Sequence, residues 1–228
     1  MWKTAELKDV CKITTGNSIP KKTKEELYTN VEGMPYIATK DVGFDASIDF
    51  QNGICIPETE LEKFKVSPAG ATLICVEGGS AGRKIAFSEN ECCFGNKLFS
   101  FVSISDLLPK FLFYYALSEQ FQSQFKNALH GLIGGVSLSK VKEFKISFPS
   151  IAEQKRIVAK LDAAFTEIDA AIEVTNEQIE SISSLKKKFI SNALTIDSQA
   201  KPLGDCCTFL NGYAFKSRDA VETSETQL

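Results

Sequence analysis

The chain has 228 residues, 43% of them hydrophobic and 24% charged, which is an ordinary globular composition with enough length for one or two domains. Its first residues are polar, and no apolar run approaches the roughly 20 residues that span a bilayer, so we expect a cytoplasmic protein without a secretory signal or a membrane span. The formal net charge is −3, so bulk charge neither supports nor excludes DNA as a partner.

The seven cysteines are scattered along the chain, and the only histidine is His130. Because no Cys-x-x-Cys spacing occurs, we expect neither a zinc site nor any other metal site. The cysteines are predicted to be reduced thiols, and no residue pattern calls for a cofactor.

Residues 1–149 predict a mixed α/β domain of the α+β class. Short apolar runs bounded by Gly, Asn or Pro predict strands, and they lie at 71–77, 84–89, 97–104 and 144–149. Residues 106–129 predict one helix, with Pro109 in its first turn and large apolar side chains at every fourth position from Phe113 to Phe125. The glycines of 130–140 then predict a loop.

A much longer helix is predicted to begin after Pro149. Ser150 and Glu153 have the spacing of a capping box, and no Gly or Pro occurs between 150 and 201. Apolar residues follow at alternating spacings of four and three, as in a coiled-coil seam. The residues that we assign to this helix–helix interface are Leu161, Phe165, Ile168, Ile172, Ile179, Ile182 and Phe189. At about 63 Å, the helix is too long for one domain to cover, so it requires a second helix of similar length.

Two stretches of the chain align without gaps at an offset of 196 residues, "ELKDVCKITTGNSI" at 6–19 and "PLGDCCTFLNGYAF" at 202–215. The identical pairs are Leu7 with Leu203, Asp9 with Asp205, Cys11 with Cys207, and Gly16 with Gly212. We therefore expect about half of a tandem protein. Its parts would be a globular domain at 1–149, a spacer helix at 150–196 and the start of a second, truncated domain at 197–228.

These features resemble the specificity subunit of type I restriction-modification systems. The most specific part is "LSKVKEFKISFPSIAEQKRIVAKLD" at 138–162, and "ELKDVCKITTGNSI" and "GGSAGRKIAF" add to it. The resemblance implies a target-recognition domain that reads one half of a split double-stranded DNA target, and two spacer helices packed antiparallel. It also implies that the subunit has no catalysis of its own and docks modification (methyltransferase) and restriction subunits.

Motifs for catalysis do not occur in the sequence. There is no Asn-Pro-Pro-Tyr or Asp-Pro-Pro-Tyr stretch for adenine methylation, and "VEGGSAGRKI" lacks the spacing of a phosphate-binding P-loop. Glu153-Gln154-Lys155 imitates the E-x-K half of a nuclease site, but Glu153 is already explained as a helix cap. We therefore expect a protein that is not an enzyme.

A DNA reader needs Lys or Arg on phosphates and polar side chains on base edges. Three lysines cluster in "SIPKKTKEE", which is predicted as a surface loop, and two basic residues follow the Gly78-Gly79 turn, where missing side chains would let phosphate approach. The residues that we assign to DNA contact are Lys21, Lys22, Lys24, Lys40, Arg83, Lys84, Asn96, Lys97 and His130. Solvated surface charge is an alternative explanation for the three clustered lysines.

Two other interpretations stay open. The chain could be the specificity region of a fused restriction-methylation enzyme, or a coiled-coil adaptor that binds only proteins. Gln154, Arg156 and the run Lys186-Lys187-Lys188 could contact a partner subunit or DNA, although an exposed charged face explains them equally well. Because the unfinished tandem leaves the seam uncovered, we expect isolated copies to self-associate through the long helix.

Overall fold

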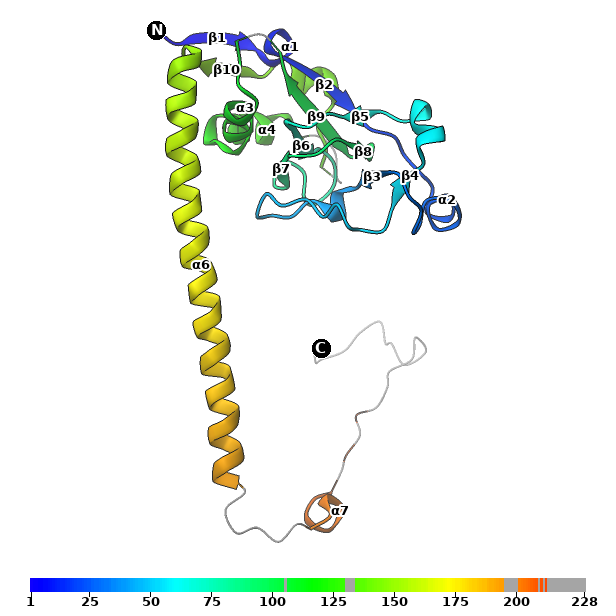
Figure 1. Cartoon of the computed structure of the whole chain (residues 1–228), viewed down its shortest axis with the longest axis vertical. Helices are drawn as coiled ribbons and strands as arrows, with labels where there is room; N and C mark the ends of the chain where they lie inside the picture. The colour runs from blue at the N-terminus through cyan, green and yellow to red at the C-terminus, as the bar shows by residue number, and fades with distance from the viewer. Residues whose placement is uncertain (105, 130–133, 195–200, 209, 211, 213–228) are drawn as a thin grey trace, which may run out of the picture. The chain divides into compact units, whose positions relative to one another are not determined.

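The computed structural model describes residues 1–104, 106–129, 134–194, 201–208, 210 and 212. The chain divides into two compact units, Met1–Ile168 and Asp169–Leu228, which are described separately below. The first unit holds an α/β domain and the first part of α6 (Ile151–Leu194), as Figure 1 shows. None of the described helices is long and apolar enough to cross a membrane.

The centre of the domain is a four-stranded antiparallel sheet in the order β2-β9-β6-β7. Its strands are β2 (Cys11–Thr15), β6 (Ala71–Cys75), β7 (Ile85–Ser88) and β9 (Leu98–Ser103). All of β6 is buried because Ile74 faces the main core while Leu73 and Cys75 face a second one. A strand covered on both faces has a continuous apolar sequence, so the strands predicted at 71–77, 84–89 and 97–104 are confirmed.

A second sheet of four short strands covers one face of the first, in the order β4-β3-β8-β5. Its strands are β3 (Met34–Ile37), β4 (Cys55–Ile56), β5 (Val66–Ser67) and β8 (Cys92–Phe94). The 3₁₀ helices η1 (Thr39–Asp41) and η2 (Glu58–Lys63) lie in its connections. The sequence did not predict these strands, because two to four residues are too few to show a periodic pattern.

The start of the chain pairs with the segment that leads into α6. β1 (Lys3–Glu6) and β10 (Lys145–Phe148) form an antiparallel pair, so the strand predicted at 144–149 is confirmed. The short helices α1 (Leu7–Val10) and α5 (Leu138–Lys142) adjoin this pair, and the Leu7 N–H donates to the Phe144 carbonyl at 2.8 Å.

The predicted single helix at 106–129 is wrong in one respect, because it is two helices, α3 (Pro109–Leu117) and α4 (Glu119–Ala128). Pro109 is in the first turn of α3, as predicted. The chain is extended at Ser118, whose hydroxyl donates to the Tyr115 carbonyl at 2.6 Å and so replaces a bond of the helical ladder. The change of direction lets α4 bury Phe121 and Phe125 in the main core.

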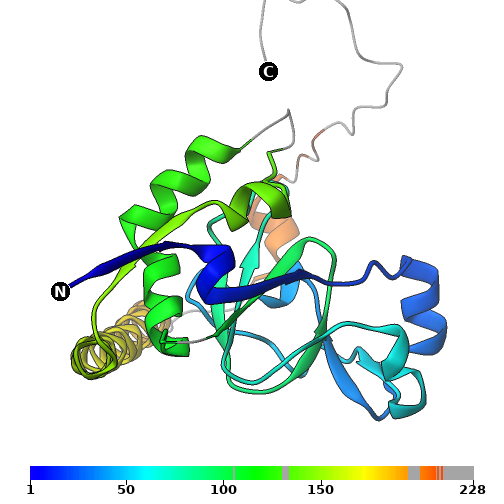
Figure 2. The same ribbon diagram turned by 90° about the horizontal axis from the view of Figure 1, so that it is seen from above.

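The lysine-rich stretch predicted as a loop is also helical. It forms α2 (Lys21–Leu27), whose exposed lysines pair with glutamates one turn later, Lys21 with Glu25 and Lys22 with Glu26. Pro20 precedes the helix, where its fixed φ suits a helix start. Figure 2 shows α2 at the end of the domain opposite α6.

The long helix α6 has 44 residues, which corresponds to about 66 Å. The predicted capping box at its start does not form, because both carboxylate oxygens of Glu153 bind the Arg156 guanidinium, at 2.7 and 2.8 Å. Gln154 is fully buried rather than exposed, so the suggestion that it contacts a partner or DNA is wrong. Its side chain forms hydrogen bonds with the backbone of the segment before α3 instead.

In the second unit, the described residues include the rest of α6 and the short helix α7 (Leu203–Cys206). At the repeat offset of 196, α7 corresponds to all four residues of α1. Each helix ends the same way, with an extended cysteine, Cys11 or Cys207, whose N–H donates to the carbonyl of the first helical residue. Leu7 is buried while Leu203 is exposed. Most of the remainder of the second copy lies outside the described residues.

Candidate DNA interface

Two connections of the domain meet at a basic cluster that contains Arg83 and Lys84. The β6–β7 connection carries both residues, and the β3–β4 connection carries Phe44. The Arg83 guanidinium carbon lies 4.9 Å from the centre of the Phe44 ring, and Lys84 Nζ lies 5.1 Å from it. Lys84 Nζ also donates to the Thr39 carbonyl at 2.9 Å, which joins the two connections. We call these residues the Arg83 cluster.

Two more of the predicted residues lie in neighbouring segments. Lys97 Nζ contacts Glu77 at 2.8 Å, and the Lys97 carbonyl accepts a hydrogen bond from Val76 N–H at 3.0 Å, directly before the Gly78 turn. The glutamate raises the pKa of Lys97, which therefore stays a cation. Lys40 follows Thr39 and contacts the buried carboxylate of Asp41 at 3.0 Å. The structure thus brings Lys40, Arg83, Lys84 and Lys97 to adjacent segments of one domain, although Lys40 and Lys97 each have an acidic partner.

The glycines before Arg83 differ in what the fold requires of them. Gly78 has φ +85°, a backbone conformation that favours glycine, and its N–H donates to the Gly134 carbonyl at 2.9 Å. A Cβ added to Gly79 would meet no atom within 4 Å, and its φ does not demand glycine. Gly82, at φ +72°, is packed so closely against Phe125 that a Cβ would come within 2.6 Å of the ring. Packing against Phe125 therefore explains why position 82 requires glycine. Neither packing nor backbone conformation requires glycine at position 79.

A cleft of about 480 Å³ lies beside Arg83, between the β6–β7 connection and α4. Arg83 and Lys126 line it together with the polar Gln122 and Ser123, and Glu119 is the acidic residue of its lining. Within the described residues, the side chains of Arg83 and Lys126 make no hydrogen bond or ion pair. The sequence did not single out Lys126, because nothing in the helix pattern shows that α4 packs beside the glycine turn.

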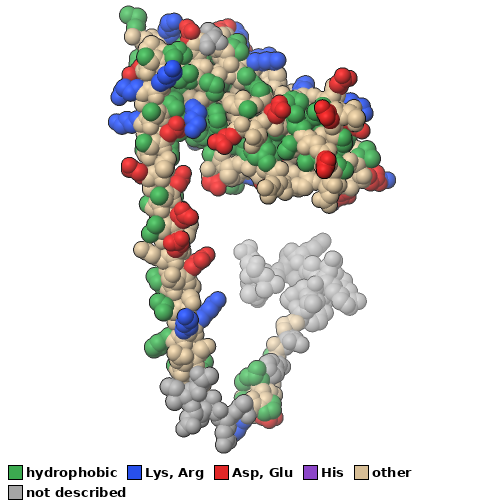
Figure 3. Space-filling model, viewed as in Figure 1, with side chains coloured by type: hydrophobic (Ala, Val, Ile, Leu, Met, Phe, Trp, Pro, Cys, Tyr) green, Lys and Arg blue, Asp and Glu red, His purple; other side chains and the backbone are tan. Residues whose placement is uncertain are grey.

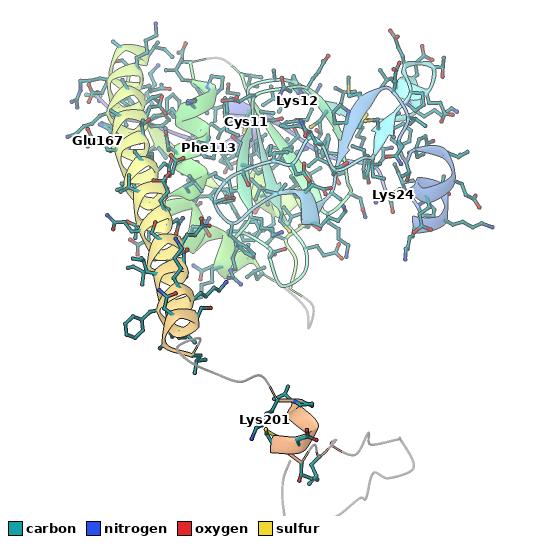
Figure 4. The ribbon with its side chains drawn as sticks, turned by 60° about the horizontal axis from the view of Figure 1, so that its bottom comes forward. Cys11, Lys12, Lys24, Phe113, Glu167 and Lys201 are labelled. Carbon is teal, nitrogen blue, oxygen red and sulfur yellow. The ribbon has the colours of Figure 1, made fainter. Side chains whose placement is uncertain are left out.

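The other predicted residues are not part of this cluster. Lys24 Nζ lies 4.9 Å from the centre of the buried Tyr36 ring. Figure 4 shows Lys24 at one end of the domain and Phe113 of α3 at the other. Asn96 is exposed in the turn before β9, where its carbonyl accepts a hydrogen bond from the Thr15 hydroxyl. His130 lies outside the described residues.

The predicted seam of α6 is uncovered over most of its length. Leu161 is half-buried, and the ring of Phe165 stacks on Tyr114 of α3 with centroids 5.7 Å apart. Beside them, Asp162 accepts hydrogen bonds from the Tyr114 hydroxyl at 2.5 Å and from Lys110 at 3.2 Å. Beyond this joint the exposed fraction of the predicted interface residues increases, from 51% at Ile168 to 77% at Phe189.

Charge is distributed unevenly along α6. Residues 161–185 contain acidic residues but no basic ones, and Lys186, Lys187 and Lys188 follow. Figure 3 shows the acidic side chains giving way to basic ones toward the C-terminal part of the helix, and in Figure 4 Glu167 points away from the domain. Across the described residues, no group of three or more His, Cys, Asp or Glu side chains could hold a metal ion.

Comparison with known proteins identifies relatives over most of the chain. The family model described as "type I restriction modification DNA specificity domain" matches residues 1–183. A curated relative, the type I restriction enzyme StySPI specificity subunit of Salmonella potsdam, is 24% identical over 200 residues. That match covers 82% of this chain and 40% of the relative, so the chain spans less than half of the relative's length.

Solved structures share the fold. A chain from a study of complex assembly and conformational transition of the type I R-M system matches with a TM-score of 0.65 and 23% identity, over 84% of this chain and 45% of that chain. The HsdS subunit from Thermoanaerobacter tengcongensis has a TM-score of 0.56 and 24% identity, over 74% and 38%. The S subunit of the type I system from M. genitalium has a TM-score of 0.53 and 20% identity, over 99% and 58%. The predicted fold class, an α/β domain followed by one long helix, is confirmed.

Proposed function

The chain belongs to the family of type I restriction-modification DNA specificity domains, and from this premise we propose that it reads one half of a bipartite target in double-stranded DNA. In this role it has no catalytic step of its own and brings modification and restriction subunits to the target. The family match over residues 1–183 is the observation that carries the proposal. The two alternatives, a fused restriction-methylation enzyme and a protein-binding adaptor, have no comparable support.

We propose three functional parts. Residues 1–149 are the target-recognition domain, 150–196 the spacer helix and 197–228 the start of a second recognition domain. The correspondence of α7 with α1 in length, backbone and final hydrogen bond supports the second copy. The first two turns of α6 pack against the recognition domain through Ile157 and Val158, so the reader and the spacer begin as one rigid piece.

The DNA-facing surface of this proposal is centred on the Arg83 cluster. Arg83 and Lys126 supply cations without an acidic partner among the described residues, and such cations bind phosphate without first breaking an ion pair. Lys84, Lys40 and Lys97 extend the same surface, and the open turn at Gly79 gives a phosphate room to approach. Lys21, Lys22, Lys24, Asn96 and His130 remain further candidates for DNA contact.

We propose that an isolated copy self-associates through α6, with the seven predicted interface residues between two antiparallel helices. Covering the exposed apolar seam removes it from water. The direction follows from charge, because antiparallel helices lay Lys186–Lys188 of each copy beside the acidic stretch of the other. Parallel helices would lay acids beside acids and lysines beside lysines, which is unfavourable. Sedimentation equilibrium at tens of micromolar tests this, and a stable monomer would refute it.

The function is tested by selection from a pool of random-sequence duplexes, with and without the partner methyltransferase. We expect enrichment of a two-part motif and binding that weakens steeply as salt increases. In an antiparallel dimer the two halves of the motif would be inverted repeats, since identical readers face opposite ways. Enrichment of no sequence would favour the adaptor. Because the proposed role requires access to DNA, we also propose that the protein is located in the cytoplasm.

A further inference from the structure

Phe44 is a large apolar side chain that the domain does not use in its cores. Its exposed fraction is 63%, and it lies within the β3–β4 connection, between a buried Val42 and the half-buried Ile48. Val42 and Ile48 form an isolated antiparallel bridge, so the residues between them make a tight hairpin-like turn. Most of the Phe44 side chain is therefore accessible to a partner of the domain.

The turn that carries Phe44 is held in one conformation. Gly43 N–H donates to the Ser47 carbonyl at 2.9 Å, and Asp45 Oδ1 accepts hydrogen bonds from the Ser47 hydroxyl at 2.6 Å and the Ser47 N–H at 3.1 Å. A Cβ on Gly43 would lie 2.0 Å from Asp45 Oδ1, so any larger residue there would displace the Asp45 side chain from its hydrogen bonds to Ser47. Ala46 adopts φ +66°, a conformation that a non-glycine residue rarely adopts. These hydrogen bonds therefore hold the turn, and with it the Phe44 ring, in a defined position.

Cations lie over the ring as well. Arg83 and Lys84 come within 4.9 and 5.1 Å of the ring centre, and Lys84 is itself bonded to Thr39 at the start of the same connection. A side chain that wedges between two base pairs needs both of its faces free, because a base pair stacks on each. At least one face of Phe44 is occupied, so the geometry favours contact through the edge of the ring. In the major groove, the apolar partner available to such an edge is the 5-methyl group of thymine.

We propose that Phe44 is a specificity-determining residue, whose ring edge contacts a thymine methyl group while Arg83 binds the DNA backbone beside it. This inference rests on the proposed function and adds to it one base and the side chain that reads it. Arg83 then has two roles, since it steadies the ring through its guanidinium face and keeps its N–H groups for phosphate.

The test combines substitutions in the protein with substitutions in the DNA. It uses the full chain and a duplex that carries the half-site enriched by the wild-type chain. Each thymine is replaced in turn by deoxyuridine, which removes only the methyl group. At one position we expect wild-type affinity to fall about four-fold, the effect of one buried methyl group. Phe44→Ala should bind the thymine duplex at least four-fold more weakly than wild type and should not respond further to deoxyuridine at that position.

Two further variants separate this role from a structural one. Phe44→Tyr keeps the ring under its cations but places a hydroxyl at the edge, so we expect an unchanged melting temperature and no response to deoxyuridine. Leu27→Ala removes another apolar side chain that is more than half exposed, on α2, and should leave both affinity and methyl response unchanged. A wild-type chain that binds its half-site but responds to no deoxyuridine, or a Phe44→Ala chain that still responds, would overturn the inference alone. A wild-type chain that enriches no sequence would overturn the proposed function and this inference with it.

Discussion

The side-chain carbonyl of Gln154 accepts a hydrogen bond from the backbone N–H of Leu108 at 2.8 Å, across 46 residues of chain. The amide nitrogen of the same side chain donates to the carbonyls of Asp106 and Pro149, at 2.8 and 2.9 Å. One fully buried glutamine therefore ties the first turn of α6 to the segment that leads into α3. The direction in which α6 leaves the recognition domain is fixed there.

Replacement of this glutamine should destabilise the domain. Gln154→Ala removes three hydrogen bonds made by a fully buried side chain, two of them part-buried and the one to the Pro149 carbonyl buried, so we expect the free energy of unfolding to fall by about 2–3 kcal/mol. Urea unfolding of the full chain measures it. Lys155→Ala, at the exposed next position, is the control and should stay within about 0.5 kcal/mol of wild type. Equal losses from both variants would show that Gln154 has no special role.

The sequence predicted those elements whose pattern is long enough to be specific. The strands of the central sheet and the 44-residue helix came from apolar runs and from heptad spacing. The sequence does not show the break at Ser118, because one serine does not interrupt the apolar pattern that runs from Phe113 to Phe125. Gln154 was misjudged because a polar residue in a first turn is usually exposed, and only the tertiary fold shows three backbone partners around it.

The candidate site was predicted only in part, for a similar reason. Clusters of basic residues along the sequence pointed to Arg83 and Lys84, and these are brought beside Lys97 and Lys40. The role of Phe44 in this site could not be predicted from the sequence. Phe44 and Arg83 are 39 residues apart, and no local pattern indicates that they are in contact. The sequence does not show that the α2 lysines lie on a helix, because α2 buries no residue and so has no apolar stripe to mark it.

Disruption of the seam should abolish self-association. Ile172 is 54% exposed and lies in the middle of the predicted interface, so Ile172→Asp would bury a carboxylate between the two helices. We expect the average mass in sedimentation equilibrium to fall from that of a dimer to that of a monomer. Glu173→Ala, on the neighbouring polar face, should leave the dimer intact. A dimer that survives Ile172→Asp would mean that α6 is not the interface.

Stability should decline in alkaline solution because buried thiols resist ionisation. Burial raises the pKa of Cys11 and of Cys93 from about 9 to about 12. The folded chain keeps these protons above pH 9 while the unfolded chain releases them, so stability is complete below pH 9 and is lost as pH rises toward 12. Each thiol contributes a loss of about 1.4 kcal/mol per pH unit in that window.

The measurement is urea unfolding at pH 8 and pH 10. Cys11→Ala should reduce the difference between the two pH values, because one of the titrating thiols is gone. A difference unchanged by this substitution would show that Cys11 does not contribute to the pH dependence.

Arg83 should contribute to DNA affinity mainly through phosphate. Arg83→Gln removes one cation without an acidic partner among the described residues, so we expect affinity to fall about ten-fold at low salt. The slope of log affinity against log salt should fall by about one. Lys63→Gln is the matched control, since Lys63 is already paired with Glu60 at 3.3 Å and lies on η2. Loss of affinity with an unchanged salt slope would argue against phosphate contact by Arg83.

Substitutions of the two glycines in the turn before Arg83 distinguish an effect on folding from an effect on DNA binding. Gly78→Ala forces a side chain into φ +85°, so we expect a loss of about 1 kcal/mol of stability. Gly79→Ala meets open space and no unfavourable φ, so stability should stay within about 0.5 kcal/mol of wild type. If DNA backbone approaches this turn as closely as proposed, the added methyl group at position 79 should still weaken duplex binding several-fold. Normal duplex binding by a normally stable Gly79→Ala chain would mean that the DNA backbone does not come close at this turn.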